Sequence, residues 1–123
     1  GWAGDPWLPW PPDPQQRNAA SLAADESSIL HLYRRLLACR RASPALHAGT
    51  WELLDAPGGV LAYERRAASD VCRVWANFTG GEVEGLSSTR DWVVEVSSTG
   101  RAEGRAWDGC LAAEEAVVLA PAG

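Results

Sequence analysis

Residues 71–78 read Val-Cys-Arg-Val-Trp-Ala-Asn-Phe, and this stretch decides the fold class. Alternate positions of an extended chain point to opposite faces, so the stretch predicts a β-strand. Its two faces are Val71, Arg73, Trp75 and Asn77, and Cys72, Val74, Ala76 and Phe78. Gly80-Gly81 follows directly and ends the strand.

The segments around this strand also resemble short strands separated by turn residues. Trp51–Asp55 and Val60–Arg65 flank Ala56-Pro57-Gly58-Gly59, which predicts a hairpin. Downstream candidates recur at the spacing of about 8–12 residues that is typical of a sandwich. They are Glu82–Leu86, Asp91–Val96, Gly104–Trp107 and Ala116–Leu119, with the bounds of the middle two left open.

One amphipathic helix, Asp25–Ala42, precedes the strands, with Asp25 as its predicted N-cap and Ser43-Pro44 as its stop. Apolar residues recur at helical spacing; they are Ile29, Leu32, Tyr33, Leu36, Leu37 and Cys39. His31 has no second ligand nearby and is read as a surface histidine. A helix followed only by antiparallel strands predicts a segregated, mainly β architecture.

The first 24 residues lack a helical or strand period and are rich in proline, which predicts an extended loop. Trp2, Trp7 and Trp10 are unusual for a free linker, so we expect this loop to lie on a protein surface. A polyproline ligand for an SH3 or WW groove is the alternative.

Composition limits the classes of function. The 123 residues suffice for one modest core, and the formal charge of −5 with no basic stripe argues against nucleic acid as a partner. No apolar run is long enough to span a bilayer, and no signal peptide is evident, so we expect a soluble protein and no membrane partner. The absence of Met, even at position 1, predicts that the natural N-terminus lies upstream.

The three cysteines, Cys39, Cys72 and Cys110, are odd in number and widely spaced. They form neither a disulfide framework nor a close-spaced metal or redox motif, so buried or incidental thiols are expected. One disulfide between two of them remains open.

The sequence offers no candidate catalytic, cofactor-binding or metal-binding residue. It lacks the nucleophile elbow, phosphate loop and zinc motifs, and no spacing selects the facing carboxylates that a glycosidase needs. Glu114-Glu115 is read as a solvated turn, and Asp91 and Glu95 as solvent-facing strand charges. No cofactor is expected.

Two further motifs have a structural and a functional interpretation. Asn77-Phe78-Thr79 matches the N-glycosylation motif, but a structural asparagine at a strand end is the preferred interpretation. Four tryptophans, which could stack on sugars as in a small carbohydrate-binding module, are more simply read as core or interface residues. They are Trp51, Trp75, Trp92 and Trp107.

In order along the chain, these elements resemble the C-terminal end of glycoside hydrolase family 13 enzymes of the α-glucosidase and oligo-1,6-glucosidase kind. Gly1-Trp2 with Pro6-Trp7-Leu8-Pro9 resembles the loop after the last barrel strand, and Asp25–Leu46 resembles the final barrel helix. Further matches are Gly49–Asp55, Val60–Tyr63, Val74–Thr79 and Glu115–Leu119, whereas Thr89–Cys110 matches least. Cys39 and Ala113 depart from the family pattern.

The resemblance implies that residues 1–48 are the tail of a (β/α)8 catalytic barrel and that residues 49–123 are an antiparallel Greek-key β-sandwich. It implies a retaining α-glucosidase acting on malto- or isomalto-oligosaccharides, whose catalytic carboxylates lie upstream of Gly1. The fragment alone is therefore expected to be inactive, with the barrel as its intramolecular partner and stabilisation of the barrel as its role. The lysine-free composition is also similar to homologues from high-GC bacteria. We expect a bacterial, cytoplasmic protein.

Overall fold

The computed structural model describes residues 4, 7–10, 12–86 and 90–123. The chain divides into two compact units, residues 1–34 and residues 35–123. The second is called the sheet unit below. Gly1-Trp2, Pro6 and Thr89 lie outside the described residues. None of the helices in the described part is long and apolar enough to cross a bilayer.

The first unit contains a short helix that the sequence reading missed. α1 (Ala19–Ala24) begins at Asn18, whose side-chain oxygen accepts from the Ser21 backbone N–H at 2.9 Å. Asn18 supplies the capping acceptor that starts a helix, so the prediction of extended loop through Ala24 was wrong at its end.

The main helix, α2 (Ile29–Ala42), starts four residues later than predicted. Asp25 is not its N-cap: the Asp25 backbone N–H caps the end of α1, and the carboxylate accepts from the Ser27 N–H and hydroxyl. These hydrogen bonds lower the pKa of Asp25. Asp25 therefore belongs to the turn between the two helices.

Ser43 and Pro44 end α2 as predicted, but they also start a further helix. The Ser43 hydroxyl accepts from the Leu46 N–H at 3.1 Å, and Pro44 occupies the first turn of α3 (Pro44–Ala48). Proline is tolerated in a first turn because its missing N–H would have no intrahelical partner there. The same pair of residues thus stops one helix and starts another.

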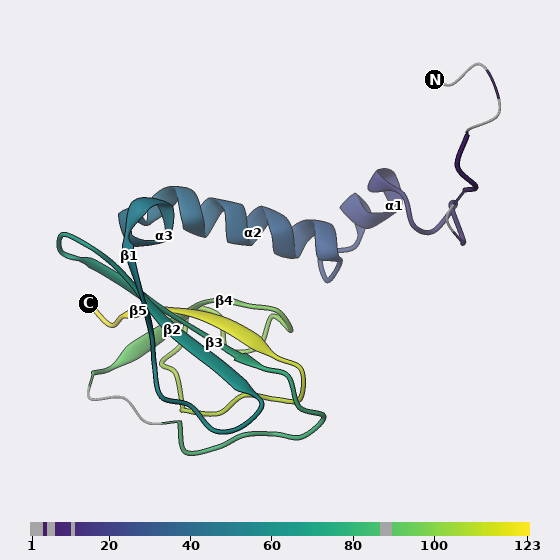
Figure 1. The fold of residues 1–123 in the computed structure, drawn as a ribbon. Coiled ribbons are helices and arrows are strands. Elements are labelled where there is room, and N and C mark those ends of the chain that lie inside the picture. Colours follow the sequence, from purple (N-terminus) through teal and green to yellow (C-terminus); the bar gives the residue numbers. More distant parts are fainter. Residues whose placement is uncertain (1–3, 5–6, 11, 87–89) are drawn as a thin grey trace. The chain divides into compact units, whose positions relative to one another are not determined.

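The described part of the sheet unit contains five strands, and Figure 1 shows their arrangement. They are β1 (Thr50–Leu53), β2 (Val60–Ala67), β3 (Asp70–Asn77), β4 (Trp92–Ser97) and β5 (Ala116–Pro121). They pair antiparallel in the order β1-β2-β3-β5-β4. The predicted hairpin is confirmed, because Thr50 pairs with Arg66 and Leu53 with Tyr63. The structure is thus a mainly antiparallel five-stranded sheet with a few helices.

Two predicted strands were wrong. In Glu82–Leu86 and Gly104–Trp107, the ladder is reduced to single bridges, Val83 with Leu111 and Ala106 with Val93. Gly85 and Gly104 have positive φ values of 72° and 75°, so the extended backbone cannot continue through either segment.

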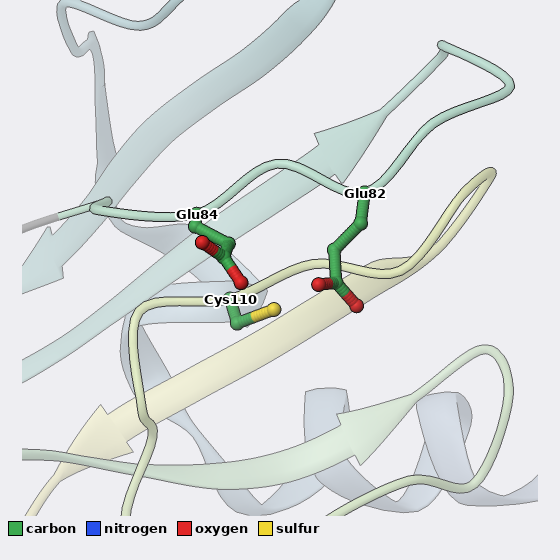
Figure 2. Close-up of side chains that lie close together, drawn as sticks. All are labelled: Glu82, Glu84 and Cys110. Atoms are coloured by element: carbon green, nitrogen blue, oxygen red, sulfur yellow. The ribbon is translucent and has the colours of Figure 1, made fainter.

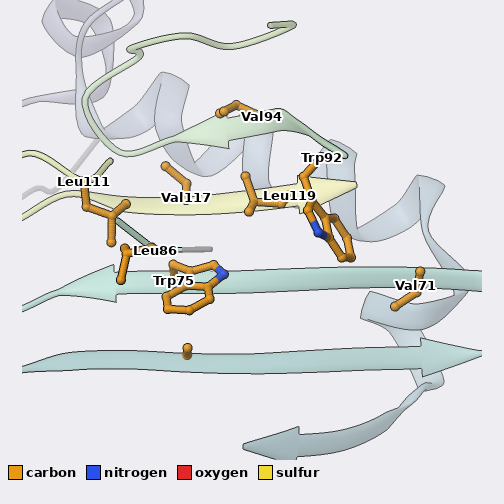
Figure 3. Close-up of a cluster of buried hydrophobic side chains, with 9 residues drawn as sticks. Val71, Trp75, Leu86, Trp92, Val94, Leu111, Val117 and Leu119 are labelled. Atoms are coloured by element: carbon orange, nitrogen blue, oxygen red, sulfur yellow. The ribbon is translucent and has the colours of Figure 1, made fainter. Parts of the chain in front are cut away.

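One face of the sheet supports the hydrophobic core (Figure 3). Register aligns Ala62, Trp75 and Val117 side by side across β2, β3 and β5. Leu86 and Leu111, from the segments that replace the two predicted strands, complete the cluster. The core therefore depends on loop residues as well as on the sheet.

Candidate functional site

The tryptophans proposed as a sugar platform do not form one surface. Trp75 and Trp92 are buried, with 4% and 3% of their surface exposed, and the Trp107 ring packs 5.5 Å from the Trp75 ring. Trp51 alone of the four is well exposed, at 56%. Core packing is thus confirmed for Trp75 and Trp92, whose buried rings have no face free to stack on a pyranose.

Two shallow hollows border these buried rings. One, of about 280 Å3, is lined by Trp92 and Trp107 together with Arg90, Asp91 and Asp108. The other, of about 360 Å3, is lined by Asp55, Pro57 and Trp75. Trp75 is almost fully buried and Trp107 is partly buried against the core cluster.

Asn77 is the structural asparagine that the sequence favoured. It is 3% exposed, and its amide nitrogen donates to the carbonyls of Gly81 and Ala112 at 2.7 and 2.8 Å. Its side-chain oxygen accepts from the Thr79 N–H and hydroxyl. Every polar atom of the side chain is therefore engaged in closing the loop after β3, which leaves no amide available for a glycan.

Glu115 contradicts the prediction of a solvated turn. Glu114 is exposed, but Glu115 is only 1% exposed. Its two oxygens accept from the hydroxyls of Ser97 and Thr99 at 2.7 Å each, from the Ala112 N–H at 2.9 Å and from Arg101 at 3.1 Å. Burial by itself raises the pKa of Glu115, but these hydrogen bonds together outweigh burial and hold the pKa below its ordinary value of 4.5.

Glu64 is the second buried carboxylate and also forms ion pairs. It binds Arg73 at 2.9 Å and also pairs with Arg66, and the Arg73 guanidinium lies 4.7 Å from the Trp92 ring. Burial opposes ionisation of Glu64, but the two arginines more than compensate, so its pKa is lowered. Glu64 and Glu115 are thus held ionised by partners and have the surroundings of structural carboxylates.

Figure 2 shows a third group, in which Glu82 and Glu84 lie beside Cys110. One ligand atom from each lies within 4.8 Å of the others, and both glutamates are exposed. Burial raises the pKa of the Cys110 thiol, which opposes the thiolate that a metal ion would require. Neither glutamate lines the two hollows described above. The group has the character of an acidic surface cluster.

All three cysteines are free thiols. Burial, reinforced by the nearby Cys72, raises the pKa of Cys39 to about 11. Burial also raises the pKa of Cys72, although a hydrogen bond with the Ser43 hydroxyl partly offsets this. Both thiols are therefore protonated at neutral pH, as expected of structural rather than reactive cysteines.

The most distinctive surface of the sheet unit is apolar. Trp51 and Leu53 on β1 are 56% and 57% exposed, and Leu61 on β2 is 38% exposed. The pairing of Leu53 with Tyr63 places these side chains on the sheet face opposite the core, where Tyr63 contacts Trp51 at 6.1 Å between ring centroids. We call these four residues, Trp51, Leu53, Leu61 and Tyr63, the hairpin face.

The known proteins that this chain resembles in sequence include several glucosidases. No protein-family profile matches the chain. A probable alpha-glucosidase of Rhizobium meliloti (strain 1021) is 42% identical over 60 residues, which cover 49% of this chain and 11% of that protein. Glucan 1,6-alpha-glucosidase of Streptococcus dysgalactiae subsp. equisimilis is 30% identical over 80 residues, or 65% of this chain and 15% of that protein.

Solved structures agree with the sequence relatives. The trehalulose synthase MutB from Pseudomonas mesoacidophila MX-45 superposes with a TM-score of 0.82 at 25% identity, over 96% of this chain and 22% of that chain. The chain thus spans a small part of each relative. With the ordered motifs and the antiparallel sheet, these matches show that the chain is similar to the C-terminal region of the α-glucosidases of glycoside hydrolase family 13.

Proposed function

We propose that this chain is the non-catalytic C-terminal part of a retaining α-glucosidase that hydrolyses malto- or isomalto-oligosaccharides in the bacterial cytoplasm. Residues 1–48 form the tail of its catalytic barrel, and residues 49–123 form a β-sandwich that stabilises the barrel. The observation that carries the proposal is the structural match over 96% of this chain to only 22% of a larger sugar-converting enzyme.

The state of the carboxylates supports a non-catalytic role. Retaining glycosidases need two carboxyl groups about 5–5.5 Å apart on either side of the scissile bond. The buried carboxylates Glu64 and Glu115 are each bound to arginine, and Glu82 and Glu84 stand together on an exposed surface. In this proposal, the nucleophile and the acid/base belong to the upstream part of the polypeptide.

The proposal also covers the arrangement of the β-sandwich and the place of the N-terminal tryptophans. The proposal includes a Greek-key arrangement; the observed order places β5 between β3 and β4, so the connection from β3 to β4 is not a simple hairpin. The second layer of the sandwich is formed by the segments around Leu86 and Leu111, which pack on the sheet. Trp7 and Trp10, 85% and 64% exposed in this chain, would find their apolar surroundings on the barrel.

Hydrolysis of p-nitrophenyl α-glucoside tests the proposal. We expect the polypeptide encoded by the whole reading frame to release p-nitrophenol and the purified chain of 123 residues to release none, because the catalytic carboxylates lie upstream. Turnover by the isolated chain would overturn the non-catalytic assignment. An inactive whole polypeptide, or a stop codon just before Gly1, would overturn the assignment to an α-glucosidase.

A further inference from the structure

The hairpin face lies at an edge of the sheet where the core does not reach. β1 is the terminal strand in the sheet order, and all four of its residues are exposed. Two of these four are Trp51 and Leu53, on the same face as Leu61. A terminal strand with exposed apolar side chains is prone to pair with other chains, and proteins normally cover such an edge or give it charges.

The other face of the same hairpin is the one that carries the core, because Ala62 on β2 belongs to the core cluster. Glu52 lies between Trp51 and Leu53 and points to the opposite face, where it pairs in register with Glu64. Arg66 also lies on that side and binds Glu64. The side opposite the hairpin face thus packs on the core and holds the buried Glu64 with its arginines, whereas Trp51, Leu53 and Leu61 remain exposed.

Only part of the apolar side is covered within the sheet unit. α3 packs against β2 and β3 at one end, where Asp70 accepts hydrogen bonds from the Ser43 hydroxyl at 2.5 Å and from the Ala45 N–H at 2.8 Å. Ala45 and Cys72 are buried there. Trp51, Leu53 and Leu61 lie further along β1 and β2, and their side chains remain exposed to solvent.

From this geometry we infer that the hairpin face is a docking surface for the catalytic part of the same polypeptide. The inference rests on the proposed function and deepens it by assigning the contact to one face of one hairpin. The first two curated relatives are about seven to nine times longer than the segments they share with this chain, which cover 11% and 15% of their lengths. Most of such an enzyme therefore lies outside the sheet unit and is large enough to cover this face.

The chemistry of the surface fits a protein layer better than a sugar. A protein interface has an apolar centre enriched in aromatic residues, with charges at its rim. Trp51, Leu53 and Leu61 supply such a centre, and Arg65 follows at the end of the same face, where its side chain donates to the carbonyls of Gly49 and Thr50. A sugar site would need polar groups free to bind beside the aromatic ring, whereas Arg65, the cross-strand partner of Trp51, donates to backbone carbonyls.

Photocrosslinking in the intact polypeptide tests the inference. Leu53 is replaced by p-benzoylphenylalanine, and Glu52, its neighbour on the opposite face, is replaced likewise as the matched control. We expect illumination to link position 53 to peptides upstream of Gly1 in the same molecule, and position 52 to give at least tenfold less product. A cross-linked dimer from position 53, or equal yields at both positions, would overturn the inference.

A second measurement examines the energetic role of the contact. The double variant Trp51→Ser/Leu53→Ser should lower the melting temperature of the intact enzyme by about 3 °C or more, whereas Glu52→Ser should leave it unchanged. If the double variant remained active and its melting temperature were unchanged, the hairpin face would not be the docking surface. Failure of the proposed function would give a different result: the intact polypeptide would have no α-glucosidase activity, with or without these substitutions.

Discussion

At the scale of single residues, Glu115 shows how a charge is kept inside the sheet unit. A buried carboxylate is destabilising unless hydrogen bonds and an opposite charge replace its water. Ser97, Thr99, Ala112 and Arg101 provide these partners. They tie the start of β5 to the end of β4 and to the loop between them, so Glu115 connects three segments of the chain.

This network predicts how stability depends on pH. The pKa of Glu115 is depressed in the folded state, so its contribution is fully present above the ordinary value of 4.5 and is lost as the pH falls through the folded value. Glu115→Gln should lower the free energy of unfolding by about 1–3 kcal/mol at pH 7, and by less near pH 3. Urea denaturation at the two pH values measures the difference.

Glu114→Gln is the matched control, because Glu114 is adjacent and exposed. It should change stability by less than about 0.5 kcal/mol at either pH. The pKa of Glu64 is also lowered, so Glu115→Gln is expected to retain part of the acid sensitivity. An equal loss at pH 7 and pH 3 would show that the charge of Glu115 contributes nothing to stability.

At the scale of elements, the junction between α3 and β1 brings backbone segments very close together. Gly49 separates the two elements, and a Cβ atom added there would lie 2.5 Å from the Ala45 carbonyl oxygen and 2.7 Å from the Arg66 oxygen. Both contacts involve backbone atoms, which cannot rotate away as a flexible side chain can. The close approach of α3 to β2 therefore requires glycine.

Gly49→Ala should destabilise the protein by about 1–3 kcal/mol, because helix α3 or strand β2 must move to admit the methyl group. Gly58→Ala is the control, since nothing lies within 4 Å of a Cβ atom at Gly58. Thermal or urea unfolding of the two variants gives the comparison. If both variants unfolded at the same midpoint, the close packing of α3 on the sheet would be refuted.

At the scale of the whole molecule, the chain exposes more large apolar side chains than a small monomer usually does. Helix α2 buries none of its residues, with Ile29 and Leu37 56% and 49% exposed, and β1 exposes Trp51 and Leu53. Large exposed apolar patches mark interaction sites or association liabilities. The apolar residues at helical spacing contribute to this exposed surface, and the hairpin face adds to it.

The isolated chain of 123 residues should therefore self-associate. We expect sedimentation velocity to show species larger than the monomer at concentrations of tens of micromolar, and Trp51→Ser/Leu53→Ser to shift the distribution towards the monomer. Glu52→Ser should leave the distribution unchanged, because Glu52 is exposed and points to the face opposite the hairpin face. A monomer at all concentrations, with a cooperative melt, would contradict this expectation.

The elements that could be predicted are those set by local patterns. Alternation in residues 71–78 and the glycines after it predicted β3, and the proline-glycine turn predicted the β1–β2 hairpin. The predictions of strands at Glu82–Leu86 and Gly104–Trp107 were wrong because Gly85 and Gly104 take positive φ values, which an alternating pattern cannot reveal. Helices α1 and α3 were missed because five or six residues are too few to establish a helical period.

The sequence by itself determined the class of the fold, the order of the motifs and the relationship to α-glucosidases, because each depends on residue patterns that are local in the chain. Only the tertiary structure decided which of the similar residues are buried: Trp75 rather than Trp51, and Glu115 rather than Glu114. Burial depends on partners distant in sequence, such as Val117 beside Trp75 and Ser97 beside Glu115. Strand register brings these partners together, and it is fixed only when the whole sheet forms.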